Sequence, residues 1–358
     1  MDYGNGSFDR VPLVDFYSLG DPKRTKKIFS RVHLALLLYL VATYAAMFLI
    51  EIIILLAAGK DAYLSVMGSS VYSLLISSGC QYAVGFPVFL LVTRGGEKAE
   101  RKQGQKMPLS HLFYAFLACQ TLMLVGNIIG LAINGIVGVF LGEAPENSVD
   151  ALVSSTPVWL LALLVVVVAP IVEELIFRKV MIDRLALFGD RTAIVASAVA
   201  FGFFHGNLYQ IFYAFLIGLV FGYVYTRTRN VWYSIGLHAV INFLGSVVSL
   251  YISKAMERIE ELAALIEEGV QVDRLEYGLL VGLETAYGLI NMALFALGAV
   301  VIGVFIHKKG LQEISRRGEI FIPKGRTFSY AFFNVGTLLF YIASVALIFL
   351  NLVSQLFA

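Results

Sequence analysis

Long apolar blocks alternate with short polar segments along the whole chain. Most of these blocks are as long as a helix must be to cross a bilayer, about 20 residues. The pattern predicts nine transmembrane helices, at residues 33–58, 71–93, 109–130 (extending towards 142), 157–177, 194–207, 208–226, 231–252, 277–306 and 329–354. The predicted fold class is therefore an all-α polytopic membrane protein.

The composition also indicates a membrane environment. Of 358 residues, 59% are hydrophobic and 15% are charged, whereas soluble domains have about 45–50% and about 25%. This composition excludes a soluble enzyme and a nucleic-acid-binding protein. Both cysteines, Cys80 and Cys119, lie inside apolar blocks, so neither a disulfide framework nor a cysteine zinc site is predicted.

Basic residues are concentrated in alternate polar segments. If the N-terminus is cytoplasmic, 23 of the 27 Lys and Arg residues fall in cytoplasmic segments and four fall outside. Because cytoplasmic loops collect Lys and Arg, this bias predicts a cytoplasmic N-terminus and an external C-terminus. The short loops are typical of a multi-pass protein of a bacterial-type plasma membrane.

The external segment 253–276 has a pattern of its own. Ile259, Leu262, Ala263 and Ile266 recur at helical spacing, and seven acidic residues fill other positions. The pattern predicts an amphipathic helix on the outer surface. The chain then divides into five predicted regions: a cytoplasmic segment (1–32), N-terminal transmembrane helices (33–156), a central group of helices (157–252), the outer amphipathic helix (253–276) and C-terminal transmembrane helices (277–358).

Ionisable side chains inside apolar blocks are costly and therefore indicate function. The fourth block ends in two adjacent carboxylates, Glu173 and Glu174, followed by Arg178. Glu174 and Arg178 are four residues apart, so they share a helix face and are predicted to pair. Glu173 is turned about 100° away, which leaves it free for chemistry.

Two histidines and an asparagine lie at similar depths in later blocks. At about 1.5 Å per residue, His238 is about 10 Å and Asn242 about 16 Å from the inner end of their span. His205 is about 16 Å and Glu173 about 6 Å from the inner ends of theirs. All four belong to the cytoplasmic half of the bilayer and are predicted to share one cavity.

These residue types suit peptide hydrolysis. A carboxylate beside a histidine can hold a water molecule and take its proton, and Asn or His can donate to the developing oxyanion. Zinc is the rival interpretation, because two histidines and a carboxylate also form a catalytic zinc set. The sequence contains no H-E-x-x-H motif, and the metal-free arrangement gives every residue a role. Taken singly, each His or Asn is also compatible with an ordinary bond between helices.

Three motifs in order resemble the CAAX protease and bacteriocin-processing family, also called CPBP or Abi. They are Glu173-Glu174-x-x-x-Arg178, Phe201-x-x-x-His205 and His238-x-x-x-Asn242. The resemblance implies that Glu173 and His205 activate the water, that His238 and Asn242 bind the oxyanion, and that Glu174 and Arg178 hold the site in shape.

The resemblance implies an intramembrane endopeptidase of CAAX type, with residues 157–252 as its CPBP-like catalytic core, acting on a membrane-associated peptide or protein. No cofactor, metal or nucleic-acid partner is predicted; the only other partner is the lipid bilayer. Two other functions stay open: a non-catalytic peptide-binding or immunity protein, and a transporter, which would also line a pathway with Glu, His and Asn.

Overall fold

In a computed structural model of the protein, residues 21–100, 103–142, 145, 147–316 and 318–355 are described. This part of the chain is built from helices and contains no long strand. The helices before residue 157 are α1 (Pro22–Met67), α2 (Ser70–Cys80), η2 (Gln81–Gly85), α3 (Phe86–Thr93), α4 (Leu109–Leu141) and α5 (Ser148–Ser155).

The remaining helices form the core and the C-terminal part. They are α6 (Val158–Leu161), η3 (Ala162–Val168), α7 (Ala169–Glu174), η4 (Leu175–Ile182), α8 (Asp183–Leu185), η5 (Ala186–Phe188), α9 (Asp190–Phe204), α10 (Leu208–Thr228), α11 (Val231–Asn242), η6 (Phe243–Val248), α12 (Ser249–Glu267), α13 (Arg274–His307), α14 (Gly310–Glu313), α15 (Thr327–Phe332) and α16 (Val335–Gln355). Several consecutive pieces, such as α6 to η5, join into one long helix.

Eight helices in the described part are long and apolar enough to cross a membrane. They are Pro22–Met67, Ser70–Thr93, Leu109–Leu141, Val158–Phe188, Leu208–Thr228, Val231–Glu267, Arg274–His307 and Val335–Ser354. The fifth predicted block, 194–207, lies mostly in α9, whose 15 residues extend only about 22 Å at 1.5 Å per residue. Helix α9 packs inside the bundle and is shorter than a helix that crosses the whole membrane.

The first helix begins earlier than its apolar block. Residues 22–32, predicted as part of a polar tail, are the first turns of α1, and Asp21 accepts a hydrogen bond from the backbone of Lys23 as its N-cap. Residues 1–20 of the predicted tail lie outside the described residues. At the other end, Gly59 adopts a left-handed φ of 84°, which breaks the helix just after the apolar block ends.

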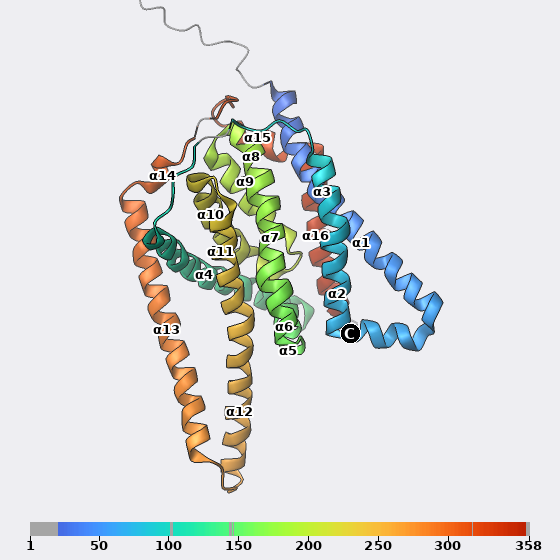
Figure 1. Ribbon diagram of the computed structural model, residues 1–358, viewed down its shortest axis with the longest axis vertical. Coiled ribbons are helices and arrows are strands. Elements are labelled where there is room, and N and C mark those ends of the chain that lie inside the picture. Colours follow the sequence, from blue (N-terminus) through green and yellow to red (C-terminus); the bar gives the residue numbers. More distant parts are fainter. Residues whose placement is uncertain (1–20, 101–102, 143–144, 146, 317, 356–358) are drawn as a thin grey trace, which may run out of the picture.

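The segment 253–276 is helical up to Glu267, but it does not form a separate helix. Helix α12 continues directly from α11 and η6, and a turn after Glu267 leads back into α13. Arg258 pairs with Glu276 across this turn, with 2.8 Å between Nε and Oε1. The amphipathic pattern therefore belongs to one arm of a helical hairpin, which extends beyond the rest of the bundle in Figure 1.

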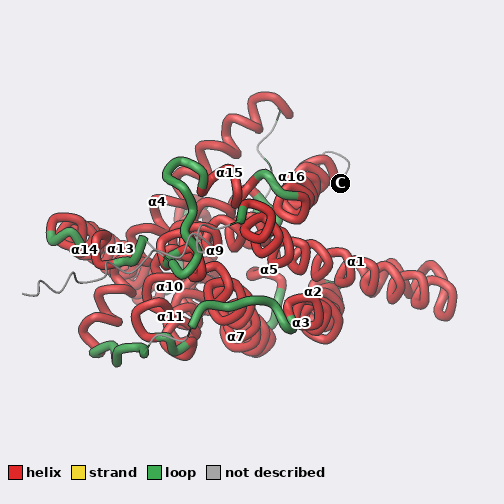
Figure 2. The backbone as a smooth tube through the Cα atoms, turned by 90° about the horizontal axis from the view of Figure 1, so that it is seen from above, coloured by secondary structure: helices red, strands yellow, loops and turns green. Residues whose placement is uncertain are grey.

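The site helices lie at the centre of the bundle. In Figure 2, α7, α10 and α11 lie between α1 to α3 on one side and α13 on the other. Close backbone approach holds α9 against α10: a Cβ on Gly218 would meet the Cα of Ala198 at 3.3 Å, and one on Gly222 would meet Ile194 at 3.1 Å. Such small-residue contacts let membrane helices pack tightly.

We propose the orientation that the charge bias predicts, and surface labelling tests it. Cysteine is introduced either at Lys106, in the exposed loop before α4, or at Val270, in the exposed turn between α12 and α13. An impermeant maleimide applied to intact cells should label only Val270→Cys, because segments with few basic residues face outward. The native Cys80 and Cys119 are buried and give little background. Labelling of Lys106→Cys in intact cells would reverse the orientation.

Candidate active site

A buried ion pair supports the site. As predicted from their spacing, Glu174 and Arg178 pair along one helix face, with 3.1 Å between Oε2 and Nε, and both side chains are fully buried. The guanidinium carbon of Arg178 also lies 4.6 Å from the ring centre of Phe201 and 5.4 Å from that of Phe221. A cation against aromatic faces in a desolvated place is stabilised by the ring quadrupoles, so this arginine is held from several sides.

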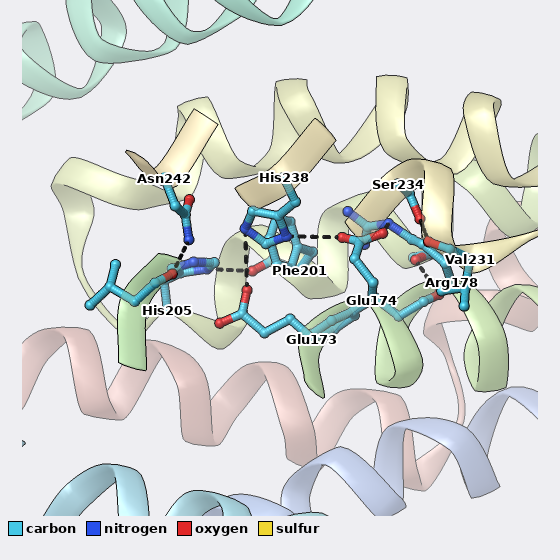
Figure 3. Close-up of polar contacts among 12 residues, drawn as sticks. Glu173, Glu174, Arg178, Phe201, His205, Val231, Ser234, His238 and Asn242 are labelled. Carbon is cyan, nitrogen blue, oxygen red and sulfur yellow. Dashed lines mark hydrogen bonds and ion pairs between the residues drawn. The ribbon is translucent and has the colours of Figure 1, made fainter. Parts of the chain in front are cut away.

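His238 bridges the two adjacent acids. Its Nδ1 atom lies 3.1 Å from Oε1 of Glu174, and its Nε2 atom lies 3.7 Å from Oε2 of Glu173. Figure 3 shows the imidazole between the two carboxylates, with Arg178 beyond Glu174. Helices α7 and α11 are thus connected through one histidine ring.

The position of protons follows from these contacts. Because Arg178 keeps Glu174 ionised, Nδ1 of His238 must donate to that carboxylate. If the ring were neutral, Nε2 would then be an acceptor facing another acceptor, Glu173. At 3.7 Å, Nε2 of His238 lies close to Oε2 of Glu173 but beyond hydrogen-bond distance.

The two acids differ sharply in environment. The side chain of Glu173 is 20% exposed, whereas that of Glu174 is fully buried. Of the two adjacent carboxylates, only Glu173 combines partial access with the absence of an arginine partner.

His205 reaches the same region from the end of α9. Its Nδ1 atom donates to the carbonyl of Phe201 over 2.8 Å, which fixes the tautomer and leaves Nε2 as an acceptor. Its ring also contacts the Phe201 ring edge-on, with 4.9 Å between centres. Phe201 touches the ring of His238 in the same way, so it separates and orients both histidines.

Asn242 hydrogen-bonds to the opposite helix at a π-helical stretch. Its Nδ2 atom donates to the carbonyl of Val165 over 2.9 Å. That carbonyl lacks its usual partners, because the N–H of Ala169 bonds to Leu164 in the π-helical stretch, and Pro170 has no N–H to offer. The asparagine amide replaces the missing donor and retains one further N–H.

The structure thus places all six predicted residues in one region, but with different neighbours from those expected. Among the described contacts, His238 is the histidine whose ring nitrogen faces Glu173, while His205 is bonded to backbone. Sequence reasoning did not single out the aromatic residues Phe201 and Phe221 as packing partners of Arg178. The Phe-x-x-x-His spacing was a signal for the first of them; Phe221 had none.

The zinc interpretation requires convergence of three ligands on one point. Within the described part of the chain, no group of three or more His, Cys, Asp or Glu residues is arranged to hold a metal ion.

Known proteins match the segment that contains this site. Residues 155–244 match the family described as Type II CAAX prenyl endopeptidase Rce1-like. The chain is also 30% identical to "Putative membrane peptidase YdiL" of Bacillus subtilis (strain 168) over 175 residues, which cover 46% of this chain and 67% of that protein. The chain belongs to the Rce1-like family. No solved structure matches it.

Family membership confirms the resemblance inferred from the three motifs. The matched segment contains every motif residue, from Glu173 to Asn242. It also overlaps most of the predicted catalytic core, 157–252. The protein is a multi-pass membrane protein of the Rce1-like family, and the site described above lies in the segment that matches the family model.

Proposed function

We propose that this protein is an intramembrane endopeptidase that hydrolyses a peptide bond with a water molecule activated by Glu173. Membership of the Rce1-like family supports peptidase activity. The observation that carries the proposal is the His238 bridge between two adjacent carboxylates, of which one is locked by Arg178 and the other is accessible. Adjacent acids in unlike environments are suited to unlike roles.

The proposed reaction starts with proton transfer from water to Glu173. His205 accepts the second O–H of that water at Nε2 and orients it. The water oxygen bonds to the substrate carbonyl carbon, and the carbonyl oxygen becomes an oxyanion. Protonated Nε2 of His238 and the remaining N–H of Asn242 donate to this oxyanion, as preorganised donors do in acyl transfer.

The second step releases the products. The C–N bond breaks, and the proton held by Glu173 passes to the leaving amine. One product carries the new carboxyl group and the other carries the new amine, so one water molecule is consumed. Throughout, Glu174 and Arg178 hold Nδ1 of His238 and touch no reacting atom. The chemistry uses no metal or cofactor.

The proposed substrate is a membrane-associated peptide or protein, and comparison of cells identifies it. Peptides from membranes of cells with wild-type protein are compared by mass spectrometry with those from cells with Glu173→Ala. New termini that require Glu173 should appear only with the wild type. Glu284→Ala, which removes an acid from α13, is the matched control and should retain them. Identical peptide sets for all three would favour a binding protein without turnover.

A further inference from the structure

A cavity opens at one end of the bundle, and none of the six site residues lines it. Its volume is about 530 Å³, within the range of small-molecule sites. The lining comes from the loop after α3, from η4 and α8, and from the end of α10: Lys98, Ala99, Glu100, Lys179, Val180, Asp183, Arg184, Tyr225 and Arg229. Four of these residues are cations and two are acids.

The internal pairs do not neutralise this lining. Asp183 accepts from Lys179 over 2.8 Å and from the Tyr225 hydroxyl over 2.6 Å, so one carboxylate is shared between two donors. Arg229 pairs with Asp190 outside the lining, with 2.7 Å between Nη2 and Oδ1. Glu100 is exposed. The cations at Lys98 and Arg184 have no carboxylate partner among the described residues.

The hydrogen bonds of Arg184 within the described residues go to carbonyl groups only. Its two terminal nitrogens donate to the carbonyls of Val180 and Thr93, over 3.0 and 2.6 Å. Its Nε atom is buried and has no hydrogen-bond partner in the described part of the chain. Carbonyl groups at a helix end attract a cation but leave its formal charge in place. The positive charge of Arg184 therefore stays at the cavity wall without a carboxylate of the described residues bonded to it.

The loop after α3 closes over this end of the bundle. The backbone of Ala99 bonds to Asp183 over 2.8 Å, and that of Gln105 bonds to Arg227 over 3.0 Å. Figure 2 shows the loop passing from α3 across the ends of α7 and α11. Arg229 ends α10 with a left-handed φ of 50°, which is uncommon for a side chain other than Gly or Asn.

We propose that this cavity binds a phosphate group, carried by an anionic lipid headgroup or by a soluble phosphate. The cations come from three segments that meet where the apolar helices end, and basic pockets between transmembrane helices bind lipid headgroups. Lysines and arginines on several sides provide the donors that phosphate oxygens accept. The proposal is independent of peptide cleavage.

Native mass spectrometry of the full-length protein tests it. The protein is placed in phosphatidylcholine nanodiscs with or without phosphatidylglycerol, and retained lipids are counted. Lys98→Gln and Lys179→Gln should each weaken retention of phosphatidylglycerol about fivefold, as expected for one cation near a headgroup. Lys106→Gln is the matched control, since it removes the same charge from the same loop outside the lining, and it should retain the lipid.

A second experiment identifies the source of the phosphate. Inorganic phosphate is added to the protein in nanodiscs of pure phosphatidylcholine, and its melting temperature is measured. The control sample contains a chloride salt, without sulfate, at the same ionic strength. Stabilisation that Lys98→Gln abolishes, without selective lipid retention, would assign a soluble phosphate. Equal weakening by Lys98→Gln and Lys106→Gln, or no selectivity in either arm, would overturn the proposal.

Discussion

Glu173→Gln is expected to slow peptide hydrolysis by about 10²–10⁴-fold, the contribution of a positioned general base. The amide keeps the shape of the carboxylate but cannot take a proton from water. Its partner, His238, remains anchored through Nδ1 to Glu174, so the fold should persist. The measurement is single-turnover cleavage of a peptide identified in the membrane comparison, together with the melting temperature of the purified protein.

Two controls make this result specific. Glu284→Gln removes an acid from α13, away from the motifs, and should cleave at the wild-type rate. Glu174→Gln should reduce activity and stability together, because it removes the partner of both Arg178 and His238. A fully active Glu173→Gln protein would exclude Glu173 as the base, whatever the other variants do. Activity lost to a chelator and restored by zinc would replace the metal-free mechanism with a metal-dependent one.

Arg178→Ala is expected to lower the free energy of unfolding by about 3–5 kcal/mol, the cost of removing one partner from a buried ion pair. The change leaves Glu174 charged and fully buried, and it empties the space between the rings of Phe201 and Phe221. Stability is measured by thermal unfolding in detergent. Arg274→Ala, on the exposed first turn of α13, is the matched control and should unfold close to wild type.

A double substitution separates charge from packing. Arg178→Met with Glu174→Gln removes both charges while it keeps most of the volume, and such replacements are often neutral or stabilising. The double variant should therefore be more stable than Arg178→Ala alone. If Arg178→Ala unfolds at the same temperature as the wild-type protein, the ion pair contributes nothing to stability and the supporting role assigned to it is wrong.

The local sequence pattern was sufficient to predict the fold class, one ion pair and the family of this protein. Block length and charge predicted an all-helical membrane protein, because a backbone in lipid must satisfy its own hydrogen bonds. The pair of Glu174 with Arg178 was equally predictable, since residues four apart share one helix face. The motifs led to the family because each is short and continuous in the sequence.

Tertiary structure decided which of these groups meet. That His238 faces both carboxylates depends on the rotation and depth of α11 relative to α7, which neither segment encodes alone. The bond from Asn242 to Val165 requires a π-helical stretch that redirects the Ala169 N–H, together with the missing donor of Pro170. The amphipathic pattern of 253–276 indicated a helix, but only packing against α13 made it one arm of a hairpin. Sequence thus determined the helices and their reactive groups, whereas contacts between distant helices determined the neighbours of each group.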